Sequence, residues 1–231
     1  MKKVGIVPTA DLFYTDNVYD DKYHFPNTYV KRAVEVGMMP VGILSVDGRV
    51  VKESLEECDC FILCGGKHIW PFQLEVIDHA VKNGKKLLGI CLGHQSVHTY
   101  FKVVEEMKKQ GYTGEIGEFW EAQDKAGVTY LKGVTGHRWE TLPRGHEQDT
   151  KHKVLVKEGT LLNRITGKTE LMGASLHKLA VYDPAPGVIV SALAEDGTIE
   201  AIEFGDKIIG TQFHPDVDDE LNCIFEYLSK Y

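Results

Sequence analysis

Short apolar runs alternate with amphipathic segments through the first half of this 231-residue chain, and this order most constrains its fold. The apolar runs have the length of buried strands, and the segments between them carry apolar residues at helical spacing. Glycines end two of these segments, as is common at the C-terminus of a helix. This order predicts an open, mostly parallel sheet with helices on both faces. The predicted strands are 4–7, 39–44, 60–63 and 86–90, and the predicted helices are 27–37, 51–57, 73–83 and 92–110.

The second half of the chain has a different pattern. Residues 111–148 are polar and glycine-rich, which favours an insertion or flap over a cleft, or else a plain surface excursion. Short β-like segments follow, and an Asp-Gly pair at 196–197 predicts a hairpin between two of them. We therefore expect a single domain over 1–231, with a smaller antiparallel β part and a closing helix at 217–228. The β-like segments are 153–156, 179–181, 188–194, 199–204 and 208–213.

Composition excludes several classes of protein. Apolar residues make up 43% of the chain, enough for a normal core, and 26 basic against 34 acidic residues give a formal charge of −8. An acidic chain with scattered lysines is a poor match for a nucleic-acid surface. The apolar run at 4–7 ends at Pro8, which is too short for a signal peptide or a membrane span. We expect a cytoplasmic protein with no nucleic-acid partner and no membrane contact.

Three of the five cysteines, Cys58, Cys60 and Cys64, lie within seven positions and raise the question of a metal site. They flank the apolar residues 61–63, as cysteines of a buried strand would, and no second cluster has zinc-like spacing. We therefore expect no metal, no cofactor and no disulfide framework, which suits a reducing compartment.

Cys91 stands in a different context, between a predicted strand and a predicted helix with Gly89 and Gly93 beside it. A sharp strand-to-helix turn exposes such a thiol at the sheet edge and directs a helix N-terminus at it, which favours the nucleophilic thiolate. The same elbow carries the serine of G-x-S-x-G hydrolases. A buried structural cysteine is the alternative, but a plain core strand has no need for the flanking glycines.

A cysteine nucleophile needs a base, and the base needs an orienting group. His214 follows a strongly apolar strand and is predicted to emerge at a strand end, where sites form in open sheets. Asp216 lies two residues further on and is expected to fix the imidazole tautomer. His94 is the rival base, but its helix is expected to carry its ring away from the elbow.

An acyl-transfer site also needs donors for the oxyanion. The backbone N–H of Leu92, directly after Cys91, is one candidate. Gly65 and Gly66 end the neighbouring predicted strand, and glycine there permits the close approach of a second N–H.

Three segments together resemble the class I glutamine amidotransferase superfamily, and within it the γ-glutamyl hydrolase, or peptidase C26, branch. They are Cys-Gly-Gly at 64–66, Gly-Ile-Cys-Leu-Gly-His-Gln at 89–95 and Gly-Thr-Gln-Phe-His-Pro-Asp at 210–216. Segments 175–181 and 196–203 are similar to that branch's Asn-Ser-x-His-x-Gln-Ala-Val and Asp-Gly-x-Ile-Glu-Ala motifs. The resemblance implies an amidotransferase-like, flavodoxin-like α/β fold over nearly the whole chain.

The resemblance further implies cysteine-dependent hydrolysis of a γ-glutamyl amide bond through a γ-glutamyl thioester. Cys91 is then the nucleophile, His214 moves the proton with Asp216 behind it, and Gly66 and Leu92 donate to the oxyanion. The residues expected at the glutamyl group of a small-molecule substrate are Gly65, Gln95, Ser175 and His177. The alternative is that Gln95 is an ordinary helix residue and that Ser175 and His177 are ordinary polar residues at a strand end.

The sequence departs from the family pattern at several positions. Asp216 stands where the family usually has Glu, and its shorter side chain reaches the imidazole only if the backbone shifts. His68 stands for Asp in the loop after the glycine pair. Leu92 replaces a frequent Arg and is more typical of glutaminase subunits, and Lys178 and Leu179 occupy the positions around an expected Gln.

These departures leave two other functions open. One is a glutaminase subunit that delivers ammonia to a synthase partner, which a separate chain would provide. The other is a catalytically silent binding or regulatory protein on the same fold. The sequence leaves open whether the protein forms a homo-oligomer.

Overall fold

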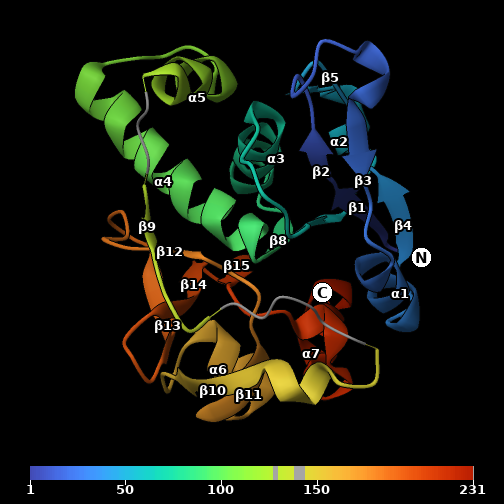
Figure 1. Ribbon diagram of the computed structural model, residues 1–231, viewed down its shortest axis with the longest axis vertical. Coiled ribbons are helices and arrows are strands. Elements are labelled where there is room, and N and C mark those ends of the chain that lie inside the picture. Colours follow the sequence, from blue (N-terminus) through green and yellow to red (C-terminus); the bar gives the residue numbers. More distant parts are fainter. Residues whose placement is uncertain (127–129, 138–143, 231) are drawn as a thin grey trace.

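The central feature of the fold is one long β-sheet, seen in a computed structural model that describes residues 1–126, 130–137 and 144–230. Its strands run in the order β11-β10-β13-β14-β15-β8-β7-β1-β4 (Figure 1). The strands from β4 to β15 pair in parallel, and those from β15 to β11 pair antiparallel. Their bounds are β1 Lys3–Val7, β4 Met39–Gly42, β7 Cys60–Leu63, β8 Lys86–Ile90, β10 Lys151–Val156, β11 Glu170–Ala174, β13 Ile189–Ala194, β14 Ile199–Phe204 and β15 Ile208–Thr211.

Helices cover both faces of the sheet, so the predicted α/β class is confirmed. Figure 1 shows α3, α4 and α5 on one side of the sheet and α1, α6 and α7 on the other. Strand β7 shows why two layers form: its side chains alternate, with Phe61 in one core and Ile62 in the other. The helix bounds are α1 Asn27–Glu35, α2 Glu53–Glu56, α3 Pro71–Lys82, α4 Leu92–Gln110, α5 Ile116–Lys125, α6 Leu161–Thr166 and α7 Cys223–Ser229.

The antiparallel half extends the parallel half as one continuous sheet. Strands β13 and β14 form the predicted hairpin, in which Gly197 takes a φ of 83° and the Thr198 N–H donates to Asp196 Oδ1 (2.9 Å). Short pairs of strands lie outside the main sheet: β2 Thr9–Asp11 with β3 Lys22–His24, β5 Ser45–Val46 with β6 Arg49–Val50, and β9 Leu131–Gly133 with β12 Leu179–Val181.

Some boundaries differ from the predicted ones. The polar segment 111–148 contains helix α5, whose Ile116, Phe119 and Trp120 are buried in the core with α3 and α4. Strand β11 and helix α6 also lie in segments where no element was predicted. The closing helix begins at Cys223, six residues later than predicted, after two 3-10 turns. The residues 127–129 and 138–143 of the predicted flap lie outside the described residues.

The cysteines in and beside β7 are core residues, as their spacing indicated. Cys58, Cys60 and Cys64 are buried, and burial raises the pKa of the Cys60 thiol to about 12. Neutral thiols of this kind pack as small apolar groups. In the part of the chain that the structure describes, no helix combines the length and apolar character needed to cross a bilayer.

Candidate functional site

Cys91 occupies the turn between β8 and α4, with backbone angles of 54° (φ) and −103° (ψ). Its N–H donates to the Thr211 carbonyl (2.8 Å), which fixes the turn to the end of β15. The flanking glycines are needed for packing. A Cβ at Gly89 would lie 2.6 Å from the Gly93 carbonyl carbon, and one at Gly93 would lie 2.8 Å from Leu63 Cβ. The helix can therefore begin directly against the sheet only with glycine at both positions.

His214 and Asp216 follow β15, the neighbour of β8. The imidazole Nδ1 lies 3.1 Å from Asp216 Oδ1, so the shorter Asp side chain does reach the ring. A 3-10 turn at Pro215–Val217 brings the carboxylate back toward the histidine. Burial lowers the pKa of His214, but the charges of Asp216 and Cys91 and hydrogen bonds to both raise it well above its ordinary value. Burial also opposes ionisation of Asp216, yet His214 and Thr28 hold the pKa of that carboxyl below its usual range.

Helix α1 supports this pair in a way that the sequence analysis missed. Thr28 Oγ1 donates to Asp216 Oδ2 (2.7 Å), and Arg32 Nε donates to the Asp216 carbonyl (3.0 Å). Tyr29 is buried, and its hydroxyl oxygen accepts the Gly65 N–H (3.0 Å). A Thr, a Tyr and an Arg on one amphipathic helix give no sequence signal for contacts that span 36 positions for Tyr29, 188 for Thr28 and 184 for Arg32.

The glycine pair at the end of β7 lies against the same residues. A Cβ at Gly65 would lie 3.1 Å from His214 Cε1 and 3.4 Å from Cys91 Cβ. A Cβ at Gly66 would lie 2.7 Å from Thr9 Cβ and 2.9 Å from a methyl carbon of Leu92. Because Tyr29 accepts the Gly65 N–H, Gly66 is the member of the pair whose N–H remains a candidate oxyanion donor.

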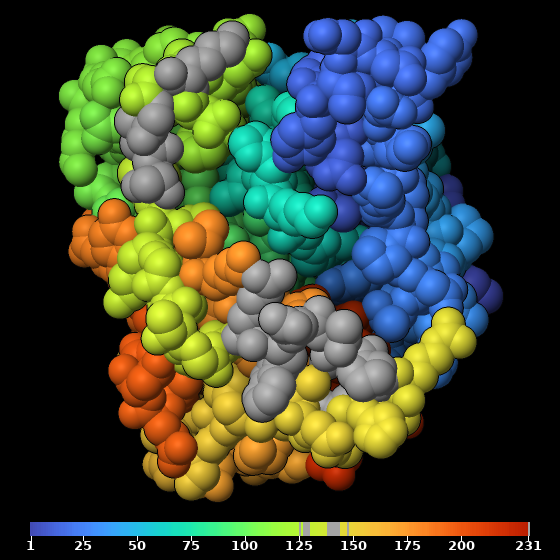
Figure 2. Space-filling model, in the orientation of Figure 1, coloured from blue at the N-terminus to red at the C-terminus, as the bar shows by residue number. Residues whose placement is uncertain are grey.

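A cavity of about 440 Å³ opens beside Cys91. The predicted site residues Cys91, Gly66, Gln95 and His177 line it, and Leu176 with Leu179 form an apolar wall. The loop that contributes Gly66 and Lys67 leads into the residues coloured teal in Figure 2, which lie between the blue N-terminal part and the orange C-terminal part. The remaining lining residues are Lys67 and Lys178. A smaller hollow of about 150 Å³ shares Lys67, Gln95 and Leu179 and includes Leu92 and His68.

The residues predicted to contact the glutamyl group already use some of their side-chain polar atoms in hydrogen bonds within the protein. Gln95 Nε2 donates to the Leu179 carbonyl (2.9 Å) and to Gln212 Oε1 (3.0 Å), so its amide nitrogen is engaged within the protein. Ser175 is fully buried, and its hydroxyl donates to the His137 carbonyl (2.6 Å). His94, the rival base, is fully buried, and a Cβ at Gly210 would lie 2.9 Å from its Nδ1.

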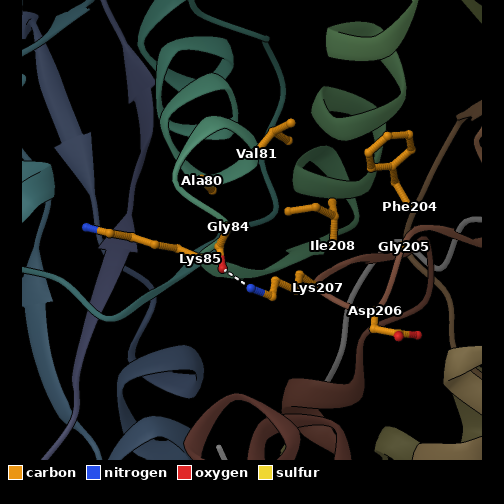
Figure 3. A pocket seen from close by; sticks show the side chains of 9 residues that line it. All are labelled: Ala80, Val81, Gly84, Lys85, Phe204, Gly205, Asp206, Lys207 and Ile208. Carbon is orange, nitrogen blue, oxygen red and sulfur yellow. Dashed lines mark hydrogen bonds between the residues drawn. The ribbon is translucent and has the colours of Figure 1, made fainter.

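A third cavity, of about 300 Å³, lies at the other end of the central strands, where β8 and β15 begin (Figure 3). Apolar side chains such as Val81, Ile208 and Phe204 line it, and Lys207 Nζ donates to the Gly84 carbonyl (2.6 Å). Ligands of open α/β sheets bind at the carboxyl ends of strands, so the cavity beside Cys91 is the better candidate.

One further cluster of polar side chains was not expected from the sequence. His137, His152, His177 and Glu200 bring one donor atom each to within 4.8 Å of one another. Their spacing along the chain matches no compact metal motif, and the two loop segments and two strands that carry them come together only in the fold.

Comparison with known proteins agrees with the geometry. The family model Peptidase C26 matches residues 71–216. The chain is 30% identical to a protein of Schizosaccharomyces pombe named as a glutamine amidotransferase, over 81% of this chain and 73% of that protein. It is 29% identical to the glutamine-hydrolysing GMP synthase of Pyrobaculum aerophilum, over 84% of this chain but only 31% of that enzyme.

The fold also matches a solved structure. The glutaminase domain of Trypanosoma brucei CTPS, with bound acivicin, superposes with a TM-score of 0.63 and 14% identity, over 99% of this chain and 92% of that one. The chain thus carries a glutamine amidotransferase-like hydrolase domain, and it belongs to the peptidase C26 family of the class I glutamine amidotransferase superfamily.

Proposed function

We propose that the protein hydrolyses a γ-glutamyl amide bond, with Cys91 as the nucleophile. The observation that carries the proposal is the convergence of Cys91, His214 and the Gly65-Gly66 pair at the carboxyl ends of three adjacent strands, β8, β15 and β7. A thiol beside an imidazole that is held by a carboxylate is the arrangement that activates a cysteine nucleophile.

The cavity supports a substrate with a free amino-acid head group. Lys67 and Lys178 are the charged residues of its lining, and both are exposed. A γ-glutamyl group carries an α-carboxylate at the end opposite the scissile amide. An ammonium group at the rim attracts such a carboxylate, while the apolar wall of Leu176 and Leu179 covers the methylene chain.

In the proposed reaction the Cys91 sulfur attacks the γ-carbonyl carbon and forms a tetrahedral oxyanion. The N–H groups of Gly66 and Leu92 stabilise this oxyanion. The His214 imidazolium gives its proton to the leaving amine as the C–N bond breaks, which leaves a γ-glutamyl thioester. Neutral His214 then takes a proton from water as the water oxygen attacks the thioester, and the C–S bond breaks to release glutamate and the Cys91 thiolate beside the His214 imidazolium.

A second candidate is a glutaminase subunit that passes ammonia to a synthase. The match to a glutamine-hydrolysing GMP synthase and the likeness to a CTPS glutaminase domain favour it. Under this alternative the amide substrate is glutamine itself, and the synthase is a separate chain.

A hydrolysis screen separates these functions. Wild type and Cys91→Ala are assayed against γ-glutamyl amides, γ-glutamyl peptides and glutamine, each without and with candidate synthase chains. Turnover of γ-glutamyl amines by the protein alone, abolished in Cys91→Ala, supports the hydrolase. Turnover of glutamine only when a synthase chain is added supports the subunit.

Labelling of the thiol tests the third alternative, a silent protein. We expect a glutamine-like chloroketone to alkylate Cys91 stoichiometrically, and His214→Ala to slow this reaction at neutral pH. A Cys91 thiol that reacts no faster than free cysteine in wild type would contradict the proposed function.

A further inference from the structure

We propose that His137, His152, His177 and Glu200 form a structural site for a divalent transition-metal ion, with zinc as its best occupant. Glu200 is fully buried on β14, and its Oε1 lies 3.3 Å from His137 Nδ1, 3.5 Å from His177 Nε2 and 3.6 Å from His152 Nε2. None of these four facing atoms has a hydrogen-bond partner among the described residues. Buried carboxylates and imidazoles seldom remain without one.

The far nitrogen of each imidazole decides which atom faces the centre. His177 Nδ1 lies 3.0 Å from the Leu179 carbonyl, and His152 Nδ1 lies 3.1 Å from the Lys153 carbonyl. His137 Nε2 lies 2.9 Å from Asp196 Oδ2. Carbonyl and carboxylate oxygens only accept, so each of these nitrogens carries the proton. In neutral imidazoles the inward nitrogen of each ring is then unprotonated and carries a lone pair. All three inward nitrogens face Glu200 Oε1, which is also an acceptor.

A cation between the four converging acceptors would satisfy them together, and the three distances to Glu200 Oε1 suit zinc. Zinc binds histidine nitrogen and carboxylate oxygen at about 2.0–2.2 Å in a tetrahedron, which puts neighbouring donor atoms roughly 3.4 Å apart. The three distances to Glu200 Oε1 fall close to this edge length. The carbonyls and Asp196 supply the outer hydrogen bonds that orient histidine ligands. Since the protein fills all four positions, the site is closed, as structural zinc sites are.

The rival occupant is a proton. The nearby carboxylates of Glu200 and Asp196 outweigh burial and raise the pKa of His137 to about 9. One proton on His137 bridges it to Glu200 but leaves His152 and His177 with inward lone pairs. A divalent ion contacts all four atoms and balances the charges of Glu200 and Asp196.

The site would fix one wall of the cavity beside Cys91. His177 lines that cavity together with Leu176 and Leu179. Its N–H donates to the His137 carbonyl (2.9 Å), and the Leu179 carbonyl accepts from both His177 and Gln95 of α4. A metal that holds His137 and His177 together therefore clamps the wall to β10 and β14. This consequence for turnover rests on the proposed function, whereas metal binding itself does not.

The test uses the full chain without a histidine tag, stripped by a chelator and then given Zn²⁺ or Co²⁺. We expect wild type to retain one zinc per chain after gel filtration, measured by inductively coupled plasma mass spectrometry. The Co²⁺ form should show the intense visible absorption of tetrahedral nitrogen and oxygen coordination. Zn²⁺ should also raise the melting temperature.

Variants locate the site. Glu200→Gln and His152→Gln should weaken zinc binding by at least about 100-fold in competition with a chromophoric chelator, and Asp196→Asn by about 10-fold. His24→Gln, which changes an exposed histidine paired with Asp11, is the matched control and should bind as wild type does. Circular dichroism and gel filtration establish that each variant is folded.

Wild type alone can overturn the proposal, so it does not depend on how the variants fold. Stripped wild type that binds neither Zn²⁺ nor Co²⁺ at equimolar concentration would mean that a proton holds the cluster. Zinc retained with wild-type affinity in both Glu200→Gln and His152→Gln would place the ion elsewhere. Because these readouts need no substrate, they remain informative even where no γ-glutamyl amide is cleaved.

Discussion

The Asp216 side chain depends on three neighbours for its position. His214 and Thr28 each bind one carboxylate oxygen, and Arg32 binds the backbone carbonyl. The 3-10 turn at Pro215–Val217 offsets the missing methylene of a family member with Glu. Asp216 therefore contacts the imidazole of His214 and raises its pKa.

Asp216→Asn should move the alkaline limb of kcat/KM to lower pH. In the proposed reaction the His214 imidazolium protonates the leaving amine, so activity is expected to fall as pH rises through its pKa. The carboxylate charge raises that pKa, so its removal lowers it. We also expect kcat/KM to fall by about 1,000-fold, since the amide can hold the wrong tautomer.

The measurement is a pH–rate profile of wild type and variant on the best substrate of the screen. Asp206→Asn makes the same chemical change at an exposed carboxylate near the start of β15, at the end of the strand away from His214. It should leave the profile unchanged. An alkaline limb that stays in place in Asp216→Asn would mean that Asp216 does not tune His214.

Lys178→Ala should raise KM for a γ-glutamyl substrate by about 10-fold while kcat changes by less than about 2-fold. The lysine is far from the reacting carbon in the proposed pose and would bind the α-carboxylate equally in ground and transition states. Steady-state kinetics check this, with the exposed helix-end Lys108→Ala as control. A fall in kcat at constant KM would assign Lys178 another role.

The sequence was sufficient to predict site residues that lie beside recognisable strands. It was not sufficient to predict contacts between segments that carry no such pattern. Cys91 and His214 could be predicted because each follows a recognisable strand, and Asp216 because it lies only two residues beyond His214. Thr28 could not, since its partner is 188 positions away and a threonine in a helix has many ordinary uses. Glu200 looked like a family motif residue, and only the fold shows three imidazoles around it.

Among the elements, helix α4 packs closely against β8 and β7. Its start lies so close to the sheet that glycine is required on the strand and in the first turn of the helix. Cys91 is the residue directly before the first residue of α4, at the helix N-terminus, where the helix dipole favours negative charge.

Gly89→Ala should lower the free energy of unfolding by about 1–3 kcal/mol, because its Cβ would overlap the Gly93 carbonyl group. Gly133→Ala is the matched control, since Gly133 lies exposed in β9 and a Cβ there meets nothing within 4 Å. We expect its effect to stay within about 0.5 kcal/mol. Urea unfolding measures both, and equal stabilities of the two variants would contradict the packing argument.

Element prediction succeeded where the hydrophobic pattern was strong. The strands of the parallel half were found within two residues because each is a continuous apolar run bounded by polar residues. Helix α5 was missed although Ile116, Phe119 and Trp120 have the i, i+3, i+4 spacing of a buried face. Three glycines at 111, 114 and 117 and a polar composition obscured that spacing.

Across the whole molecule, a parallel half and an antiparallel half share one sheet, and the candidate site lies at the parallel half. Strand β15 joins the halves and precedes His214, while the wall of the cavity comes from the segment between β11 and β12. The sequence predicted both kinds of pairing. It could not show that they form one continuous sheet, because strand order depends on contacts between distant segments.

Hydrogen exchange should follow position in this sheet. Strands β8 and β15 have partners on both sides and lie under both cores, so their amides should exchange only in global unfolding. The edge strands β4 and β11 should exchange at least about 100-fold faster, since local opening exposes them. Mass spectrometry of peptic peptides measures this, and equal protection of β11 and β8 would contradict it.

The positive φ of Cys91 bears on how such a protein would evolve. Any residue with a Cβ is strained there, by an amount on the order of 1–3 kcal/mol, whereas glycine adopts such angles readily. A lineage that kept this fold only to bind a partner would gain stability by drifting to glycine at position 91. The cysteine is thus the costlier choice, and its presence favours a chain still under selection for a reactive thiol over a silent relative.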